Sequence, residues 1–488
     1  MGGAFLRRAK DAVRAVDAPT WGLDLKEIND GIEHARSRSV IDLAMRIAES
    51  TLATGASAAD VTANVLSVTK AYGLRSVHVD VTFTAITVTH HRGPLADPVT
   101  MVRTVRVRTA DYERLARTYA LITDITDNGL PLEEARGRFE RIMERPPAYR
   151  RGVVTLSFAL LGAGVAALLG GNLTAILLAA IIVGIVDRCL MWTARQRLTE
   201  FFGQMVGGAI PAAIAMFLVA SRDWLPDFLL NVNPSLLVST GIVVQLAGLS
   251  VVGAAQDAID GFYVTASART FEVVVLTLGL LVGVIGVITI ASRLGTPAYV
   301  IPPSAVAPYL VVQILAVAMI AASFAIGTYA GPRTILVSVA MAVIGWSAYA
   351  FFLSLDLDRV SSTAVACVVV GFLSQLSAGR FAVPSLALAT AGIVGFLPGG
   401  MVFRALYYMV ETPVRVTAET NGPNLLMGAI ATGLAIAGGV SLGGYLGWQV
   451  RGGDRARDRV KDKALRSTAP IEEEPARRRR RPKRRARG

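Results

Sequence analysis

The stretch LAGLSVVGAAQDAIDGFYVTASARTFE, residues 246–272, connects two apolar segments of the chain through a short polar break. The break contains Asp257 and Asp260, and Arg269 and Glu272 follow at the start of the second apolar segment. The two carboxylates are three residues apart, so they would share one face of a helix. A charge at the centre of a membrane helix costs roughly 2.5–3.5 kcal/mol on insertion scales. The break is therefore either an ordinary polar loop or a segment that folds back and lines a water-filled path.

Composition indicates a membrane protein with polar ends. Of the 488 residues, 53% are apolar and 17% are charged, whereas average globular domains carry about 25% charged residues. No lysine occurs between Lys70 and Lys461, and the middle of the chain holds long apolar runs. The first residues lack the apolar region of a cleavable signal peptide, so we expect none. Cys189 and Cys367 are too few for a disulfide framework or a thiolate metal cluster, and we expect no cofactor and no metal.

Residues 1–150 are polar and carry the helical patterns of a small folded domain. An apolar stripe of helical spacing stops at Gly55, and the segment Ser57–Asp60 fits the capping box of a second helix. Two later helices are expected to begin near Tyr112 and after Pro131. The stripe that ends before Gly55 consists of Ile41, Leu43, Ala44 and Ile47.

The same region contains strand patterns. Residues 77–85 alternate apolar and polar side chains, which predicts one half-buried strand, and a second strand is expected over 99–107. Together with the helices, these strands predict an α+β domain, and regulation or gating from the cytoplasm is its favoured role.

A hydrolytic site in this region is an alternative of another class. All four histidines lie here, at positions 34, 78, 90 and 91. His90 and His91 are adjacent and would face opposite sides of a strand, which argues against a shared metal. His78 and Asp80 supply residue types for catalysis without a recognisable motif. A membrane-anchored hydrolase therefore stays a minor alternative, and we expect that the protein is not an enzyme.

The remainder of the chain predicts a polytopic α-helical membrane protein with ten transmembrane helices. Several segments are near the lower length limit for a span, and frequent Gly and Ala residues suit close helix packing. The ten apolar segments are 152–170, 173–187, 200–220, 235–255, 271–291, 308–328, 333–353, 362–378, 383–400 and 424–447.

Charge predicts the orientation of these spans. Arg145, Arg150 and Arg151 precede the first segment, and the tail from Arg451 carries 16 basic against 6 acidic residues. An even number of spans puts both ends on the cytoplasmic side, as the positive-inside rule prefers. The loop after the second segment, with Arg188, Arg195 and Arg197, agrees with this orientation. The expected parts are a cytoplasmic α+β domain (1–150), two five-helix membrane repeats (151–300 and 301–450) and a basic disordered cytoplasmic tail (451–488).

An internal repeat accompanies this division. AGLSVVGAAQDAIDGFY (247–263) is similar to AGIVGFLPGGMVFRALYY (391–408). Each is a small-residue helix, a polar break and paired aromatics, followed by an arginine (Arg269 or Arg415) and another apolar span. Five spans per half would insert the halves in opposite orientations, as in many secondary transporters. Chance similarity of Gly/Ala-rich helices is the alternative.

The segment GAAQDAIDGFYVTASARTFEVVVL resembles the signature of the threonine/serine exporter family. Asp257, Gly261, Arg269 and Glu272 fit the family pattern, as does Ser267 or one of its neighbours, while Gln256 and Phe262 stand where the family usually has an arginine and an aspartate. The segment GASAADVTANVLSVTKAYGLRSVHVDVTFTAITVT resembles the soluble domain of this family, and FLPGGMVFRAL resembles its C-terminal half. The resemblance extends over residues 35–448.

The resemblance implies a secondary transporter of the bacterial plasma membrane. It implies ten spans and export of threonine and serine driven by the proton motive force. Two-chain relatives are linked to dicarboxylate export, so small dicarboxylates are the alternative substrate class. Small-molecule substrate and protons are the implied partners, and a homo-oligomer is left open.

Candidate transport residues lie in both halves. Asp257 and Asp260, with Arg269 and Glu272 as partners, are candidates for handling a proton or a substrate ammonium. Freed backbone amides at Pro398–Gly400 could hold a substrate carboxylate at a half-helix start. The candidate substrate-binding residues are Pro398, Gly399, Arg404, Gln204 and Gln375.

Each of these candidates has a structural alternative. Pro398–Gly400 could simply end the ninth span, and Arg404 could snorkel to the membrane interface. Gln204, Gln375 and Gln245 could bond helix to helix.

Two charged features are expected to be interfacial. Asp187 and Arg188 are expected to pair at the membrane surface. The run RRRRRPKRRARG is expected to touch anionic lipid headgroups, and it has no aromatic residues or fold for binding nucleic acid.

Overall fold

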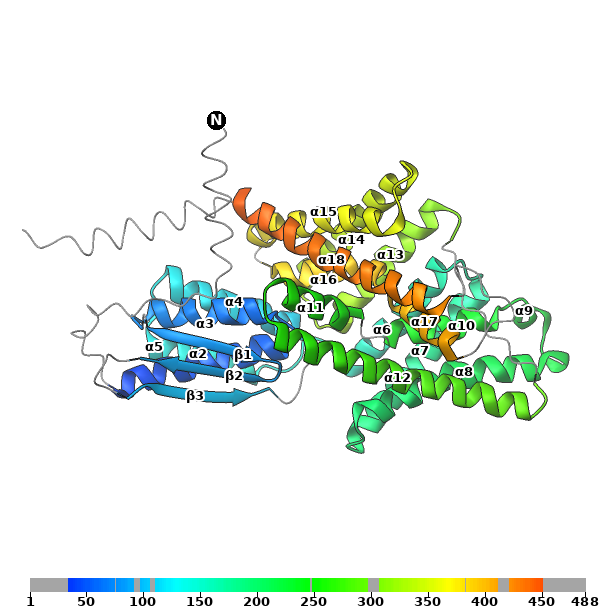
Figure 1. Cartoon of the computed structure of the whole chain (residues 1–488), viewed down its shortest axis with the longest axis horizontal. Coiled ribbons are helices and arrows are strands. Elements are labelled where there is room, and N and C mark those ends of the chain that lie inside the picture. The colour runs from blue at the N-terminus through cyan, green and yellow to red at the C-terminus, as the bar shows by residue number, and fades with distance from the viewer. Residues whose placement is uncertain are drawn as a thin grey trace, which may run out of the picture.

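A computed structural model describes residues 34–74, 76–91, 97–105, 110–245, 248–296, 307–381, 383–410 and 421–450. An α/β unit lies at one end of the molecule, and a bundle of apolar helices fills the rest (Figure 1). The basic tail, from which lipid contacts were predicted, lies outside the described residues.

The α/β unit is built from residues 34–144. A three-stranded antiparallel sheet has the order β1-β2-β3. Helices α2 and α3 pack on the sheet, and α4 and α5 complete the unit. The bounds are α2 His34–Ala53, α3 Ala58–Ala71, β1 Val77–Thr82, β2 Ala85–His90, β3 Val99–Thr104, α4 Tyr112–Asp127 and α5 Leu132–Glu144.

The helical predictions for this unit are confirmed. The apolar stripe of α2 is fully buried in the core, and Gly55 ends the region with a φ of +96° that favours glycine. The Ser57 hydroxyl accepts a hydrogen bond from the Asp60 amide at 3.1 Å, as the expected cap requires. Helices α4 and α5 begin at Tyr112 and just after Pro131.

The prediction of one continuous strand over 77–85 was wrong. The segment is a hairpin in which Thr82 pairs with Ala85, and Phe83 takes a positive φ of 52°. Hairpin turns with positive φ are usually signalled by Gly or Asn, and neither occurs here. Val81 of β1 pairs with Ile86 of β2 and both are buried, so the buried positions change from odd to even numbers across the turn.

Eight described helices are long and apolar enough to cross a membrane. They are α6 Arg151–Leu168, α7 Leu173–Arg195, α8 Glu200–Ala220, α12 Tyr263–Arg293, α13 Leu310–Gly327, α14 Pro332–Ser354, α15 Arg359–Phe381 and α18 Gly422–Val450. Helix α7 is longer than the predicted segment 173–187, so Arg188 lies inside it. Exposed Leu173, Leu177, Ile181 and Ile185 of α7 recur every four residues and form a face suited to lipid.

Two predicted spans are short or broken helices. The segment 235–255 corresponds to α10 (Pro234–Gln245) and α11 (Gly248–Ile259), whose directions differ by 44°. The segment 383–400 corresponds to α16 (Ser385–Ile393), the 3₁₀ turn η3 (Val394–Phe396) and the start of α17 (Gly399–Val410). Counting the bent pair α10–α11 as one span gives nine candidate spans among the described residues. The ten predicted spans are therefore not all long continuous helices. Between α8 and α10 the chain forms a 3₁₀ turn, η2 (Arg222–Trp224), and a short helix, α9 (Asp227–Leu230).

Glycines allow two helix pairs to approach closely. On α12, a Cβ at Gly283 would meet the Met205 carbonyl of α8. On α18, a Cβ at Gly439 would lie 2.6 Å from the Ala364 carbonyl of α15. Lipid is as apolar as the helix surfaces, so the hydrophobic effect does not drive membrane helices together. Close packing of this kind stabilises their association instead.

We expect Gly439→Leu to lower thermal stability strongly, because its side chain would force α18 away from α15. The neighbouring Gly438→Leu is the matched control, since a Cβ at Gly438 meets nothing within 4 Å. The thermal midpoint of the detergent-purified protein should fall for Gly439→Leu and stay near the parent value for Gly438→Leu. Equal midpoints for the two variants would contradict this packing.

Candidate functional site

A buried ion pair between the apolar helices α11 and α12 also binds the first turn of α3 in the α/β unit. Asp257, near the end of α11, is fully buried, and Arg269 of α12 exposes only 6% of its surface. Arg269 Nη1 lies 3.0 Å from Asp257 Oδ2. The other carboxylate oxygen, Oδ1, accepts a hydrogen bond from the Ala58 amide at 3.1 Å. Ala58 is the first residue of α3, so the positive end of this helix dipole also stabilises the carboxylate.

The hairpin of the α/β unit is held by the same membrane helix. The Thr265 hydroxyl of α12 donates to the Val81 carbonyl at 2.9 Å. It also accepts a hydrogen bond from the Phe83 amide at 3.1 Å. The backbone groups of this unusual turn are therefore satisfied by a helix almost two hundred residues away.

A third contact lies at the start of α4. The Tyr112 amide donates to the Thr328 carbonyl at 2.9 Å, and the Thr390 hydroxyl of α16 donates to the Tyr112 hydroxyl at 2.9 Å. Burial raises the pKa of Tyr112 to about 12. The Tyr149 hydroxyl likewise donates to the Ala330 carbonyl at 2.9 Å. The α/β unit thus contacts both halves of the membrane part.

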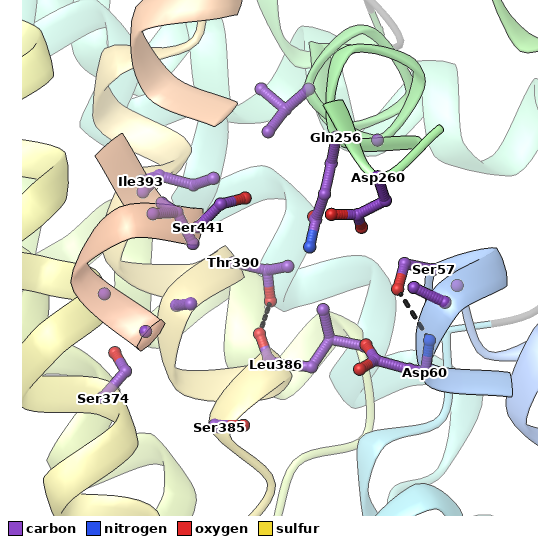
Figure 2. A pocket seen from close by; sticks show the side chains of 18 of the residues that line it. Ser57, Asp60, Gln256, Asp260, Ser374, Ser385, Leu386, Thr390, Ile393 and Ser441 are labelled. Atoms are coloured by element: carbon purple, nitrogen blue, oxygen red, sulfur yellow. Dashed lines mark hydrogen bonds between the residues drawn. The ribbon is translucent and has the colours of Figure 1, made fainter. Parts of the chain in front are cut away.

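These contacts surround a cavity of about 520 Å³ between the α/β unit and the ends of α11, α12, α15, α16 and α18 (Figure 2). Its walls carry hydroxyls, amides and charges of both signs. The polar side chains that line it are Thr54, Ser57, Asp60, Tyr112, Ser250, Gln256, Asp260, Arg269, Ser374, Gln375, Ser385, Thr390, Ser441 and Tyr445.

Two carboxylates in the cavity walls are hard to ionise. Burial raises the pKa of Asp260 from 3.8 to about 6, and the negative charges of Asp60 and Asp257 add to this effect. Burial also raises the pKa of Asp60, with a further contribution from Asp257. The surface of Asp60 is open to the cavity, but the surrounding protein displaces most of the bulk water that would solvate its charge.

Two hydroxyls in the cavity walls lack hydrogen-bond partners among the described residues. They belong to Ser374 of α15, which is 1% exposed, and to Ser441 of α18. Buried polar groups in native proteins are nearly always satisfied. Such groups are therefore suited to bind a polar ligand or water.

The structure brings together some of the predicted site residues. Asp257 and Arg269 pair directly, while Asp260, Arg269 and Gln375 line the cavity. Glu272 follows Arg269 on α12, half-buried, and is not among the lining residues.

The other predicted residues lie outside the cavity. They are Gln204 on α8, Pro398 and Gly399 at the break between η3 and α17, and Arg404 on α17. The candidate residues therefore lie in two places, some at the cavity and some on α8 and around the break before α17.

Sequence reasoning missed several cavity residues. Asp60 was noticed only as part of a helix cap, and Ser374 and Thr390 were not noticed at all. A polar residue in an apolar helix was the available signal for these two.

Two further polar residues have partners within the membrane part. Gln245 donates to the Gly207 carbonyl of α8 at 2.8 Å, so it bonds helix to helix. The predicted pair of Asp187 with its neighbour Arg188 was wrong: Asp187 pairs with Arg151 of α6 at 2.6 Å, because the two helices pack side by side.

The histidines form local contacts. The His78 and His91 rings pack edge to face at 5.3 Å, and Asp80 accepts a hydrogen bond from Thr82. The His90 ring lies 3.1 Å from the Ser76 carbonyl. These contacts do not orient His78 and Asp80 as a catalytic pair.

Comparison with known proteins covers both halves of the chain. Residues 42–291 match the family model described as "Putative threonine/serine exporter", and residues 313–446 match "Threonine/Serine exporter, ThrE". The chain is 35% identical to the "Probable threonine/serine exporter" of Mycobacterium tuberculosis, over 87% of this chain and 79% of that protein. It is 34% identical to the "Threonine/serine exporter" of Corynebacterium glutamicum, over 90% of this chain and 88% of that protein. No solved structure matches the chain.

Arg269→Gln should destabilise the protein by about 3–5 kcal/mol, because it leaves the buried carboxylate of Asp257 without its cation. Combining it with Asp257→Asn removes that charge and should restore much of the loss. Thermal unfolding of the two single variants and the double variant in detergent measures this coupling. Strictly additive losses would show that the two side chains act independently.

The folded state binds a proton at Asp260 more tightly than the unfolded state, because the folded pKa is about 6 against 3.8. Stability should therefore fall as pH rises from about 4 through 6, by at most about 3 kcal/mol. Asp60, Asp257 and Arg269 are the charged groups near this carboxyl. Asp260→Asn should raise the unfolding midpoint at pH 7.5 and change it little at pH 4. A stabilisation that is the same at both pH values would contradict the raised pKa.

Proposed function

The chain belongs to the threonine/serine exporter family, and on that premise we propose that it exports threonine and serine from the cytoplasm. The observation that carries this proposal is the cavity, whose walls combine carboxylates, a guanidinium and hydroxyl groups. A zwitterionic hydroxy amino acid needs partners of these three kinds. A volume of about 520 Å³ is ample for one such molecule and its waters.

Within this cavity, Asp260 would bind the substrate ammonium and Gln375 would hydrogen-bond its polar groups. Arg269 would provide positive potential toward the substrate carboxylate, while its ion pair with Asp257 keeps it in position. This division of roles replaces the idea that Asp257 and Asp260 act alike. It is supported by their different surroundings: Asp257 is fully buried against two partners, and Asp260 faces the cavity.

A second position for the substrate carboxylate would lie deeper in the bundle. Pro398 and Gly399 stand at a helix break, and Arg404 follows on α17. A backbone break at membrane depth is tolerated only where it packs on protein or faces a water-filled cavity. We assign these residues, with Gln204, to a later point on the transport path.

Ten spans in two inverted repeats remain part of the proposal. Each half has three long helices, then a broken or short pair, then a helix of 31 or 29 residues: α12 in the first half and α18 in the second. In each half the third long helix packs against the last one through glycines. Counting α10–α11 and α16–α17 as one crossing each makes the halves enter the membrane from opposite faces.

The course of the chain supports a location of both ends of the membrane part on the same side of the membrane. Tyr149, before α6, contacts Ala330 after α13, and Tyr445, near the end of α18, lines the cavity beside the α/β unit. The α/β unit and both ends of the membrane part would then be cytoplasmic, in keeping with the arginines at 145, 150 and 151 and with the positive-inside rule.

Proton coupling would involve Asp260. A carboxyl with a pKa of about 6 changes its proton occupancy within the physiological range. Proton and substrate ammonium would compete for the same carboxylate, which is the simplest way to exchange one for the other. The nearby charges are those of Asp60, Asp257 and Arg269.

The two alternatives have less support. A dicarboxylate would meet the negative charges of Asp60 and Asp260 in the cavity. A hydrolase would need a nucleophile and an oriented base, and His78 and Asp80 are engaged in other contacts.

We expect cells that produce the protein to release threonine faster than cells without it, after loading with a threonine-containing dipeptide. A protonophore should slow this release if the proton gradient drives it. Asp260→Asn should abolish most of the release and its protonophore sensitivity, whereas Arg404→Gln should raise the half-saturating threonine concentration. Asp127→Asn, at the exposed end of α4, is the control.

Three results would contradict parts of this proposal. Equal release by producing and non-producing cells would exclude threonine as substrate. A rate of threonine release that is unchanged by the protonophore would exclude proton coupling. Normal transport by both site variants would exclude the assigned residues.

A further inference from the structure

Asp60 belongs to the α/β unit but faces the transport cavity. It lies in the first turn of α3, three residues after the Ser57 cap. Its carboxylate and that of Asp260 project into the same cavity from different walls (Figure 2). Asp60 comes from the α/β unit, and Asp260 follows the last turn of α11.

The two carboxylates have no compensating cation among the described side chains. Arg269 is the cationic side chain in the cavity wall, and it is committed to the Asp257 carboxylate at 3.0 Å. Burial raises the pKa of both carboxyls, and neighbouring carboxylates raise it further: Asp60 and Asp257 act on Asp260, and Asp257 acts on Asp60. Two carboxylates that share a site favour a proton or a bound cation between them.

A second observation points to a ligand in the same cavity. The Ser374 hydroxyl is buried, lines the cavity and has no hydrogen-bond partner among the described residues. The Ser441 hydroxyl also lines the cavity without a partner among these residues. Ser374 belongs to α15 and Ser441 to α18, and both lie across the cavity from α3 in Figure 2. A ligand with a positive group at one end and hydrogen-bonding groups at the other would satisfy both walls.

We propose that Asp60 and Asp260 together bind the ammonium group of the substrate, so that the α/β unit supplies part of the substrate site. The choice of an amino acid as ligand rests on the proposed function; the cation subsite rests on the cavity. Asp60 is then a specificity-determining residue for primary ammonium compounds. Because it sits on the α/β unit, an occupied site bridges that unit to the membrane helices.

The test uses the purified full-length protein and measures binding by titration calorimetry. The probes are threonine, threoninol, which keeps the ammonium and lacks the carboxylate, and 3-hydroxybutyrate, which lacks the ammonium. The parent should bind threonine and threoninol and bind 3-hydroxybutyrate at least tenfold more weakly.

Asp60→Asn should weaken binding of threonine and threoninol by at least about tenfold, which equals about 1.4 kcal/mol. Its effect on the already weak binding of 3-hydroxybutyrate should be small, because that probe has no ammonium to lose. Asp60→Glu should recover part of the affinity. Asp127→Asn is again the matched control, and a thermal midpoint at or above the parent value shows that Asp60→Asn is folded.

The outcomes separate this inference from the proposed function. Parent-like threonine affinity in folded Asp60→Asn, with normal threonine release by the parent in cells, overturns the role of Asp60 and leaves the exporter intact. Equal losses for all three probes also overturn it, because they indicate a general structural effect. Asp60-dependent binding of threoninol without threonine export supports the cation subsite and refutes the proposed substrate.

Discussion

The buried contact between Asp257, Arg269 and the first amide of α3 is the constraint on which the rest of the structure depends. Removing two charges from water costs several kcal/mol per ion, and their mutual attraction repays this only when geometry and further hydrogen bonds are good. Here the helix α3 supplies both an amide donor and the positive end of its dipole. The membrane helices and the α/β unit therefore complete one another, and neither surface of the contact is suited to face the solvent or lipid alone.

This contact also sets the charge of the cavity beside it. Because Arg269 is held by Asp257, it cannot neutralise Asp60 and Asp260 as well. The cavity keeps an excess of negative charge next to unpaired serine hydroxyls. Such a surface favours an ammonium group with hydrogen-bonding neighbours over a small dianion. The ion pair on which α3 docks thus also contributes to the chemistry of the cavity beside it.

Close packing and broken helices have complementary roles in the membrane part. Glycines let α15 and α18, and likewise α8 and α12, approach until the backbones are in contact. The short elements α10, α11, α16 and α17 stand between them. Helix ends and breaks leave amides and carbonyls that a continuous helix would satisfy internally, so these elements need partners from protein or water.

The sequence by itself determined the class of protein, most helices and the strand-forming segments, because apolar periodicity and caps are local signals. Gly55 and the Ser57 cap predicted element ends closely, whereas the long apolar runs located most of the long helices but not all of their ends, since α7 extends to Arg195 and α12 begins at Tyr263. It also singled out Asp257, Asp260 and Arg269, since charges beside apolar segments are conspicuous. Only the tertiary structure decided that Asp257 is buried against Arg269 and α3 and that Asp260 faces a cavity. Residues three positions apart can have quite different surroundings in the folded protein. Asp60 lines the cavity only because α3 packs beside helices that lie far away in the sequence, and no local pattern in the sequence indicates such a neighbour.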